Sequence, residues 1–196
     1  MSRHRQSLIL VAGAVAILGG FTTARAQQPQ LPAGLDSIRM ALAKYANPVV
    51  AVHDGYFSSL GCVQFDQGGG MGQMQYVAGA MGVHFLNLEL VGKPLDPLHP
   101  QVLLYEPVGD SLRLAGAEWF VPTAIQKQQP QLLGRGFDGP MAGHEPLLPE
   151  SLHHWDLHVW LWKQNPAGLF SPTNPAVKCP VAAYTMHEVA PKMVEP

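Results

Sequence analysis

The segment from His153 to Trp162, named here the Trp strand, places the tightest constraint on how this chain folds. It reads His-His-Trp-Asp-Leu-His-Val-Trp-Leu-Trp, and its alternation with a period of two predicts a β-strand. One predicted face is apolar and carries Trp155, Leu157, Val159 and Leu161. The opposite face carries His154, Asp156, His158, Trp160 and Trp162. Core faces seldom carry ionisable groups and surface faces seldom carry paired tryptophans, so the second face is predicted to line a pocket.

The first 26 residues have the three parts of a secretory signal peptide. Arg3 and Arg5 give a positive start, and the apolar stretch Leu8–Phe21 is too short to span a bilayer comfortably. Ala24-Arg25-Ala26 fits a cleavage signal. We therefore expect residues 1–26 to be removed and the mature protein to be periplasmic or secreted.

Charge and hydropathy exclude two classes of partner for the mature chain. Cleavage removes three of the twelve Lys and Arg and none of the fourteen Asp and Glu, so the net charge becomes more negative than −2. The chain has no basic run and no basic-aromatic patch of the kind that binds nucleic acid. After Ala26 no apolar stretch is long enough to cross a membrane. We expect neither a nucleic-acid partner nor membrane insertion.

The mature chain is predicted to form one α+β domain over residues 35–180. A helical repeat of Leu35, Ile38, Leu42 and Tyr45 predicts one N-terminal helix, which Asn47-Pro48 should end. About five mostly antiparallel strands should follow, in a curved sheet or a partly closed barrel, beginning with the β-branched run Val49–Val52. No alternation of strands and helices indicates a parallel α/β sheet.

The two ends of the mature chain are predicted to lie outside this domain. Residues 27–34 are rich in Gln and Pro and predict a disordered leader. Residues 181–196 predict a loose C-terminal tail.

Cys62 and Cys179 are the only cysteines, and an exported pair usually oxidises. We therefore predict a disulfide, which would close a loop of about 117 residues and stabilise the fold by roughly 4–5 kcal/mol. The alternative is a thiolate metal ligand or a free thiol.

Four ionisable residues form the main candidate for a metal site: His84, Glu118, His154 and His158. Each shares a predicted strand face with apolar residues. Imidazoles with a carboxylate suit a transition metal such as Zn, Fe, Mn or Cu. Positions four apart on a strand are separated by about 13 Å, so His154 and His158 are not expected to bind the same ion.

Two strand pairings remain open. If the Trp strand pairs with the predicted strand Leu112–Val121, His154 falls near Glu118. If the sheet closes beside the strand of His84, then His84 falls nearer His158. In either case Asp156, which lies between the two histidines, is expected to accept a hydrogen bond from an imidazole and so fix its tautomer. The simpler alternative is a set of hydrogen-bonded interior polar residues.

Two further groupings are weaker candidates. Met71, Met74 and Met81 with His84 offer thioether and imidazole ligands for copper, although a flexible Gly/Met loop over a pocket explains them as well. His53-Asp54 forms either an acid/base pair or a turn.

Two motif matches carry no function. The string Gly134–Gly139 matches a dinucleotide-binding pattern, but no strand precedes it and Pro140 follows it. The chain also lacks the G-x-S-x-G motif of serine hydrolases. We expect no nucleotide cofactor.

Several blocks of the sequence carry a resemblance to a group of small exported bacterial proteins of uncharacterised function. The most distinctive block runs from His154 to Trp162 and continues through Asn165-Pro166-Ala167-Gly168 and Asn174-Pro175 to Cys179. Further blocks are Gly82-Val83-His84, Leu103–Pro107 and Glu118-Trp119. The resemblance covers most of the mature chain and implies that these blocks form one domain. It implies no reaction.

Two functions follow as hypotheses from different classes. The first is an exported protein that binds a metal or a small ligand in a pocket lined by His, Glu and Trp, with Phe85, Trp160 and Trp162 as its apolar wall. The alternative is a metal-dependent enzyme with a His/His/Glu site.

Overall fold

A computed structural model describes residues 31–32, 34–71, 74–145, 148–180 and 184–196. The predicted signal peptide and all but the last few residues of the predicted leader lie outside these ranges. Within the described residues, no helix is long and apolar enough to cross a membrane.

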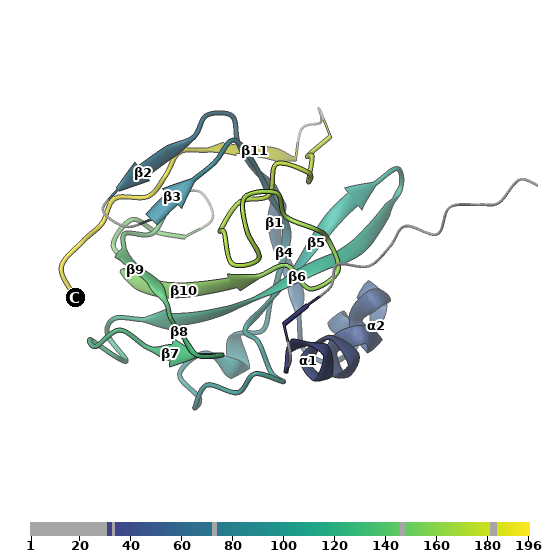
Figure 1. Cartoon of the computed structure of the whole chain (residues 1–196), viewed down its shortest axis with the longest axis horizontal. Helices are drawn as coiled ribbons and strands as arrows, with labels where there is room; N and C mark the ends of the chain where they lie inside the picture. Colours follow the sequence, from purple (N-terminus) through teal and green to yellow (C-terminus); the bar gives the residue numbers. More distant parts are fainter. Residues whose placement is uncertain (1–30, 33, 72–73, 146–147, 181–183) are drawn as a thin grey trace, which may run out of the picture.

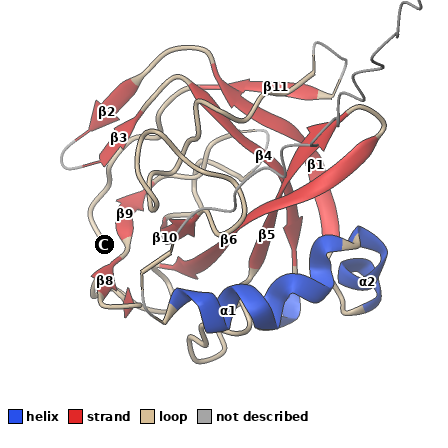
Figure 2. Ribbon diagram, turned by 45° about the vertical axis from the view of Figure 1, so that its right-hand side comes forward, coloured by secondary structure: helices blue, strands red, loops and turns tan. Residues whose placement is uncertain are grey.

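The N-terminal segment forms two short helices joined by a 3₁₀ turn, where one helix was predicted. These are α1 (Leu35–Leu42), η1 (Ala43–Ala46) and α2 (Pro48–His53). The predicted apolar stripe from Leu35 to Tyr45 is buried, which confirms that this part of the chain packs on the sheet. Figure 2 shows both helices together on one side of the sheet.

The predicted strand at Val49–Val52 is wrong, because Asn47 and Pro48 begin a helix instead of ending one. The side-chain oxygen of Asn47 accepts a hydrogen bond from the N–H of Val49 at 3.0 Å. Pro48 occupies the start of α2, where its missing N–H has no helical partner to lose. The cap and the proline therefore outweigh the β preference of the three valines.

Within the described part of the chain, seven strands form one sheet that curls into a half-barrel (Figures 1 and 2). Neighbouring strands are antiparallel except β1 and β11, which are parallel. The curved, mostly antiparallel sheet was predicted, but with about five strands. In order across the sheet the strands are β11 (Thr185–Glu188), β1 (Phe57–Phe65), β4 (Gly79–Leu86), β5 (Val102–Val108), β6 (Ser111–Pro122), β10 (His154–Val159) and β9 (Asp138–Met141).

Shorter elements occupy the stretches that were predicted as loops. A hairpin of β2 (Gly69–Met71) and β3 (Met74–Tyr76) precedes β4, and a second hairpin pairs β7 (Gln131–Leu132) with β8 (Arg135–Gly136). A 3₁₀ turn, η2 (Leu88–Leu90), follows β4. Strands of two or three residues are too short to show a hydrophobic period, so the sequence pattern did not indicate them.

The C-terminal tail was predicted to be loose, but part of it forms a strand. Residues 185–188 form β11, which pairs in parallel with Cys62–Phe65 of β1. Glu188 at its end is buried, with 8% of its surface exposed. A four-residue strand whose partner lies over a hundred residues away has no local signal in the sequence.

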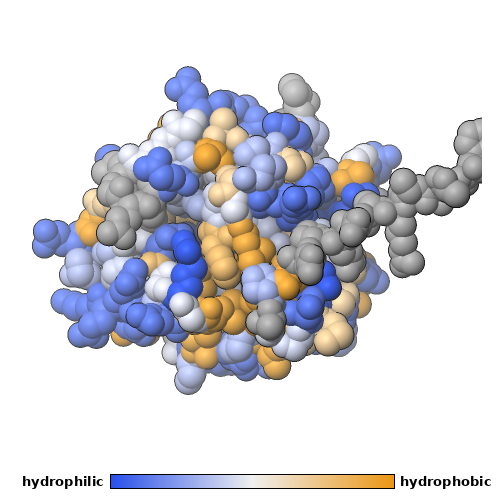
Figure 3. Space-filling view, in the orientation of Figure 1, coloured by the Kyte–Doolittle hydropathy of each residue, from blue (hydrophilic) through white to orange (hydrophobic). Residues whose placement is uncertain are grey.

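Strand alternation divides the side chains between the two faces of the sheet. The outer face packs under the helices, with Trp119, Leu157 and Val159 among the buried residues of the larger core. A smaller cluster, including Phe65, Tyr76 and Met81, lies within the half-barrel. On the face seen in Figure 1, exposed apolar side chains form a central area between polar ones (Figure 3). Only 13% of residues are charged, which fits this mixed surface.

The predicted disulfide is confirmed. Cys62 in β1 is bonded to Cys179, with 5.5 Å between the two Cα atoms and a sequence separation of 117. The N–H of Cys179 also donates to the side-chain oxygen of Gln64 in β1. The bond thus attaches the chain after the Trp strand to the first strand of the sheet, just before β11 adds to its edge.

Replacement of both cysteines, Cys62→Ser with Cys179→Ser, should leave the fold intact and lower its melting temperature by roughly 10 °C. The reason is the entropy of a long loop, worth about 4–5 kcal/mol, which the unfolded chain regains. Differential scanning calorimetry checks this, with the wild-type protein in reductant as the matched control. Equal melting temperatures of the variant and the oxidised wild-type protein would contradict the assigned role.

Candidate functional site

The centre of the sheet brings together residues from four neighbouring strands at one level. Leu86 of β4 lies opposite Val102 of β5, which lies opposite Glu118 of β6, which in turn lies opposite His158 of β10. His84 lies two positions before Leu86 on the same face of β4. Because the sheet curls, side chains on this inner face converge even when a strand separates them.

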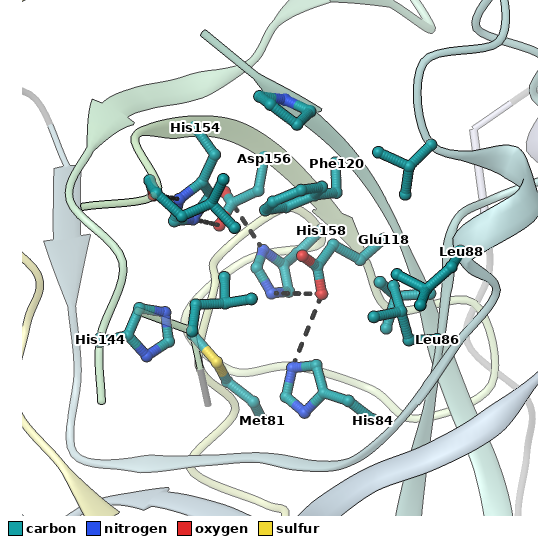
Figure 4. A pocket seen from close by; sticks show the side chains of 15 residues that line it. Met81, His84, Leu86, Leu88, Glu118, Phe120, His144, His154, Asp156 and His158 are labelled. Atoms are coloured by element: carbon teal, nitrogen blue, oxygen red, sulfur yellow. Dashed lines mark hydrogen bonds and ion pairs between the residues drawn. The ribbon is translucent and has the colours of Figure 1, made fainter. Parts of the chain in front are cut away.

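Three of these side chains form a buried cluster. The Nε2 atom of His84 lies 3.6 Å from Oε2 of Glu118, and the Nε2 atom of His158 lies 3.5 Å from the same oxygen. One possible ligand atom from each residue lies within 4.8 Å of the others. Figure 4 shows the two imidazoles directed at the carboxylate from different sides. We name these three residues the His–Glu cluster.

The register of β6 and β10 decides between the two pairings that the sequence left open. His158 is opposite Glu118, whereas His154 is opposite Pro122, the last residue of β6. The prediction that this pairing would bring His154 to Glu118 is therefore wrong. His154 instead stacks near Phe120, with 4.8 Å between ring centroids, and its Nδ1 lies 3.1 Å from the carbonyl oxygen of Leu152.

A β-bulge in β4 sets the position of His84. Pairing with β1 shifts between Val63 and Gln64, so that Met81 and His84 both line the inner cavity although alternation alone would separate them. Gly82 within the bulge has φ +90°, and a Cβ there would lie 2.3 Å from the carbonyl oxygen of Tyr105. Only glycine fits this position.

Asp156 lies beside the His–Glu cluster, next to His158. Its Oδ1 is 3.6 Å from Nδ1 of His158, and its Oδ2 is 4.0 Å from Nε2 of His154. The three residues share one face of β10, and the carboxylate stands between the two imidazoles (Figure 4). Asp156 is therefore placed to orient the ring of His158 from its Nδ1 side, so that Nε2 of His158 points at Glu118.

Burial and charge set the protonation of the cluster. Burial lowers the pKa of His84 to about 3, so its ring is neutral at pH 7. Burial also opposes charge on His158, but Glu118 and Asp156 together outweigh it and raise the pKa of His158 to about 9. Burial raises the pKa of Glu118 to about 7. Two buried carboxyl groups thus share a single cationic imidazole, and the site favours a positive charge at its centre.

Hydrogen bonding does not account for these polar atoms. Buried polar groups are nearly always paired, yet several in this part of the described structure have no hydrogen-bond partner. They are His84 Nδ1, Glu118 Oε2, Asp156 Oδ1, and both ring nitrogens of His158. The separations of 3.5–3.6 Å around Glu118 Oε2 exceed a normal hydrogen bond, whose length is about 2.7–3.2 Å.

The cluster lines a cavity of about 210 Å³. Polar lining comes from the cluster and from His144, His154 and Asp156. The rest of the lining is apolar: Met81, Leu86, Leu88, Val91, Val102, Phe120, Pro122, Leu148 and Leu152.

The aromatic wall of the predicted pocket is not part of this cavity. Phe85 faces the outer side of β4 and packs on Tyr105, with 4.6 Å between ring centroids. Trp160 leaves the inner face because β10 ends at Val159; its Nε1 donates to the carbonyl oxygen of Ser171, and the ring is fully buried in the larger core. Trp162 packs against the same core. Phe120, which the sequence reading did not select, supplies an aromatic ring instead.

The weaker candidates divide in the same way. Met81 lines the cavity beside His84 (Figure 4), whereas the side chains of Met71 and Met74 fall outside the described part of the structure. His53 is the last residue of α2 and is exposed, with its Nδ1 3.3 Å from Oδ1 of the adjacent Asp54. It is not among the residues that line the cavity.

Two buried groups near the cavity were missed in the sequence reading. His144 lines the cavity, and its Nδ1 lies 3.8 Å from Oε2 of Glu188 on β11. Burial lowers the pKa of His144 to about 4 and raises the pKa of Glu188 to about 7. Both residues lie in segments without a clear period, so only their residue types could have indicated them.

A scan against protein-family models and searches of curated proteins and of solved structures gave no match. The resemblance drawn from the sequence blocks therefore stays a prediction. The chemistry of the site rests on its geometry, in which two imidazole nitrogens and one carboxylate oxygen lie close enough together to hold a cation in a largely apolar cavity.

The buried carboxyl group of Glu188 should make stability depend on pH. Its pKa is about 7 in the folded protein against an ordinary value of 4.5, so the folded state holds the proton more tightly. The free energy of unfolding contributed by Glu188 should therefore fall as the pH rises from 4.5 to 7. Glu188→Gln should remove this contribution, which urea unfolding at several pH values in EDTA would measure.

The matched control is Glu195→Gln, because Glu195 is exposed in the same C-terminal segment. It should unfold with the pH dependence of the wild-type protein. A Glu188→Gln variant with an unchanged pH dependence would show that Glu188 is not protonated on folding.

Proposed function

We propose that this protein binds one transition-metal ion, such as Zn, Fe, Mn or Cu, through the His–Glu cluster. The ligands are Nε2 of His84, Nε2 of His158 and a carboxylate oxygen of Glu118. The single observation that carries the proposal is the position of Glu118 Oε2, which is buried without a hydrogen-bond partner and lies 3.5–3.6 Å from Nε2 of both His84 and His158.

These separations suit a shared ion better than a polar contact. Two ligand atoms that each lie 2.0–2.1 Å from a tetrahedral metal are about 3.3 Å apart. Small rotations of the side chains would bring the three ligand atoms to that spacing. A divalent ion would also balance the two buried carboxylates, Glu118 and Asp156, which otherwise share the charge of His158.

Three protein ligands leave at least one coordination position for another molecule. All three ligand residues line the cavity, so this position faces its interior (Figure 4). Two histidines with one carboxylate and an open position are typical of catalytic rather than purely structural metal sites. We therefore propose a protein that binds a small molecule at its metal.

A metal-dependent enzyme is the second candidate function. The observation that favours it is the presence of His144 and His154 in the same cavity without a role as ligands. Burial lowers the pKa of both rings, so they are neutral at pH 7 and each can hydrogen-bond a molecule bound at the metal. Turnover of a bound molecule that requires the metal would distinguish the enzyme from a binding protein.

We further propose that the protein acts outside the cytoplasm. The Cys62–Cys179 disulfide supports this, because such bonds persist in oxidising compartments.

Metal binding should depend on each member of the His–Glu cluster. We expect the untagged wild-type protein, stripped and reconstituted with Zn²⁺, to bind one ion per chain. Glu118→Gln, His84→Ala and His158→Ala should each weaken the affinity by about 100-fold or more, since each removes a direct ligand. Isothermal titration calorimetry and elemental analysis measure affinity and stoichiometry.

Two histidine variants serve as controls. His154→Ala removes a buried histidine from the same strand, and His53→Ala removes an exposed one, so both should keep one ion per chain. Circular dichroism of each variant establishes that it has folded. Folded ligand variants that still bind Zn²⁺ at wild-type affinity would refute the proposed site.

A further inference from the structure

The cavity beside the His–Glu cluster has an uneven distribution of polar groups. Every polar lining residue is a histidine or a carboxylate. Five of them form a continuous row, with 3.5–4.0 Å between neighbouring side chains from His84 through Glu118, His158 and Asp156 to His154. Among the residues that line the cavity in the described structure, none is Lys, Arg, Ser, Thr, Asn, Gln or Tyr. A molecule with hydroxyl or amide groups along its length would leave those groups without hydrogen bonds, which is costly in a buried site.

Charge in the cavity disfavours anions. Glu118 and Asp156 are both buried, with 6% and 3% of their surface exposed, and no Lys or Arg is among the described residues that line the cavity with them. Two carboxylates neutralise the charge of one divalent ion. An additional anion would therefore carry an uncompensated charge into an apolar space.

The cavity is accessible from solvent beside η2. Leu88 lines the cavity and yet 60% of its surface is exposed, so it lies at the rim. Leu86 and Val91 on either side of it are partly buried. The volume of about 210 Å³ is below the range of about 300–1,000 Å³ that is usual for drug-sized ligands. The occupant must be smaller than these.

We propose that the open position of the metal takes a small uncharged molecule with an apolar body and a single oxygen donor, of the alcohol or carbonyl class. The inference rests on the metal site proposed above. The donor atom faces the His–Glu cluster, while the body contacts the apolar lining, which includes Phe120, Leu86 and Leu88 (Figure 4). Molecules that carry many hydroxyl groups or a negative charge fit this lining less well.

Three probes with the same seven-carbon skeleton test this class. They are benzyl alcohol, which is neutral with one donor; benzoate, which is anionic; and toluene, which has no donor. Each is titrated into the full mature chain loaded with Co²⁺, whose visible absorption changes when a ligand joins the metal. We expect benzyl alcohol to change the spectrum and to bind about tenfold or more tightly than benzoate, because benzoate meets two carboxylates.

A variant at the rim tests the location. Leu88→Trp should weaken the affinity for benzyl alcohol by about tenfold, because the larger ring fills the opening. The variant should still bind one Co²⁺ per chain. The matched control is Leu98→Trp, at a leucine that is 44% exposed and does not line this cavity. This control should bind benzyl alcohol like the wild-type protein.

The outcomes separate the two proposals. If the wild-type chain takes up no Co²⁺, the metal site itself is refuted. If it binds Co²⁺ but no probe changes the spectrum, or an equal concentration of toluene reverses half or more of the change caused by benzyl alcohol, the metal site stands and the inferred ligand class is overturned. Tighter binding of benzoate would overturn the charge argument, and an unaffected Leu88→Trp variant would overturn the location.

Discussion

Six consecutive residue pairs join β6 to β10, and their register determines what stands at the centre of this protein. It places His158 opposite Glu118, while Trp119 and Leu157 face each other in the core on the other side. A slip of one residue would move every side chain of the Trp strand to the opposite face. The same buried aromatic and aliphatic residues that stabilise the sheet therefore also hold the cluster in place.

The register has an electrostatic consequence. It buries Glu118 and Asp156 on either side of His158, in a part of the sheet where few hydrogen bonds are offered to them. Isolated buried charges are strongly unfavourable, so such a group persists only with a compensating cation. His158 supplies one positive charge, and a metal held with His84 would supply a stronger one. The largely apolar lining of the cavity next to it lowers the local dielectric and so strengthens these interactions.

Much of the site could be predicted from the sequence, because alternation assigns residues to faces. The inner face of the Trp strand, the bonded cysteines and the ionisable residues at 84, 118 and 158 follow from pattern and residue type alone. Alternation does not reveal which residue of one strand lies opposite which residue of the next. The choice between His154 and His158 therefore needed the observed register. It also does not reveal where a strand ends, which is why Trp160 was expected in the pocket but lies in the core.

Anomalous X-ray diffraction from crystals of the Zn²⁺-loaded protein, collected on both sides of the zinc absorption edge, tests the central claim most directly. The account predicts one strong anomalous peak about 2.0–2.2 Å from His84 Nε2, His158 Nε2 and an oxygen of Glu118. His154 should not contact the ion, and Asp156 should accept a hydrogen bond from Nδ1 of His158. A peak elsewhere in the chain, or none within the half-barrel, would contradict it.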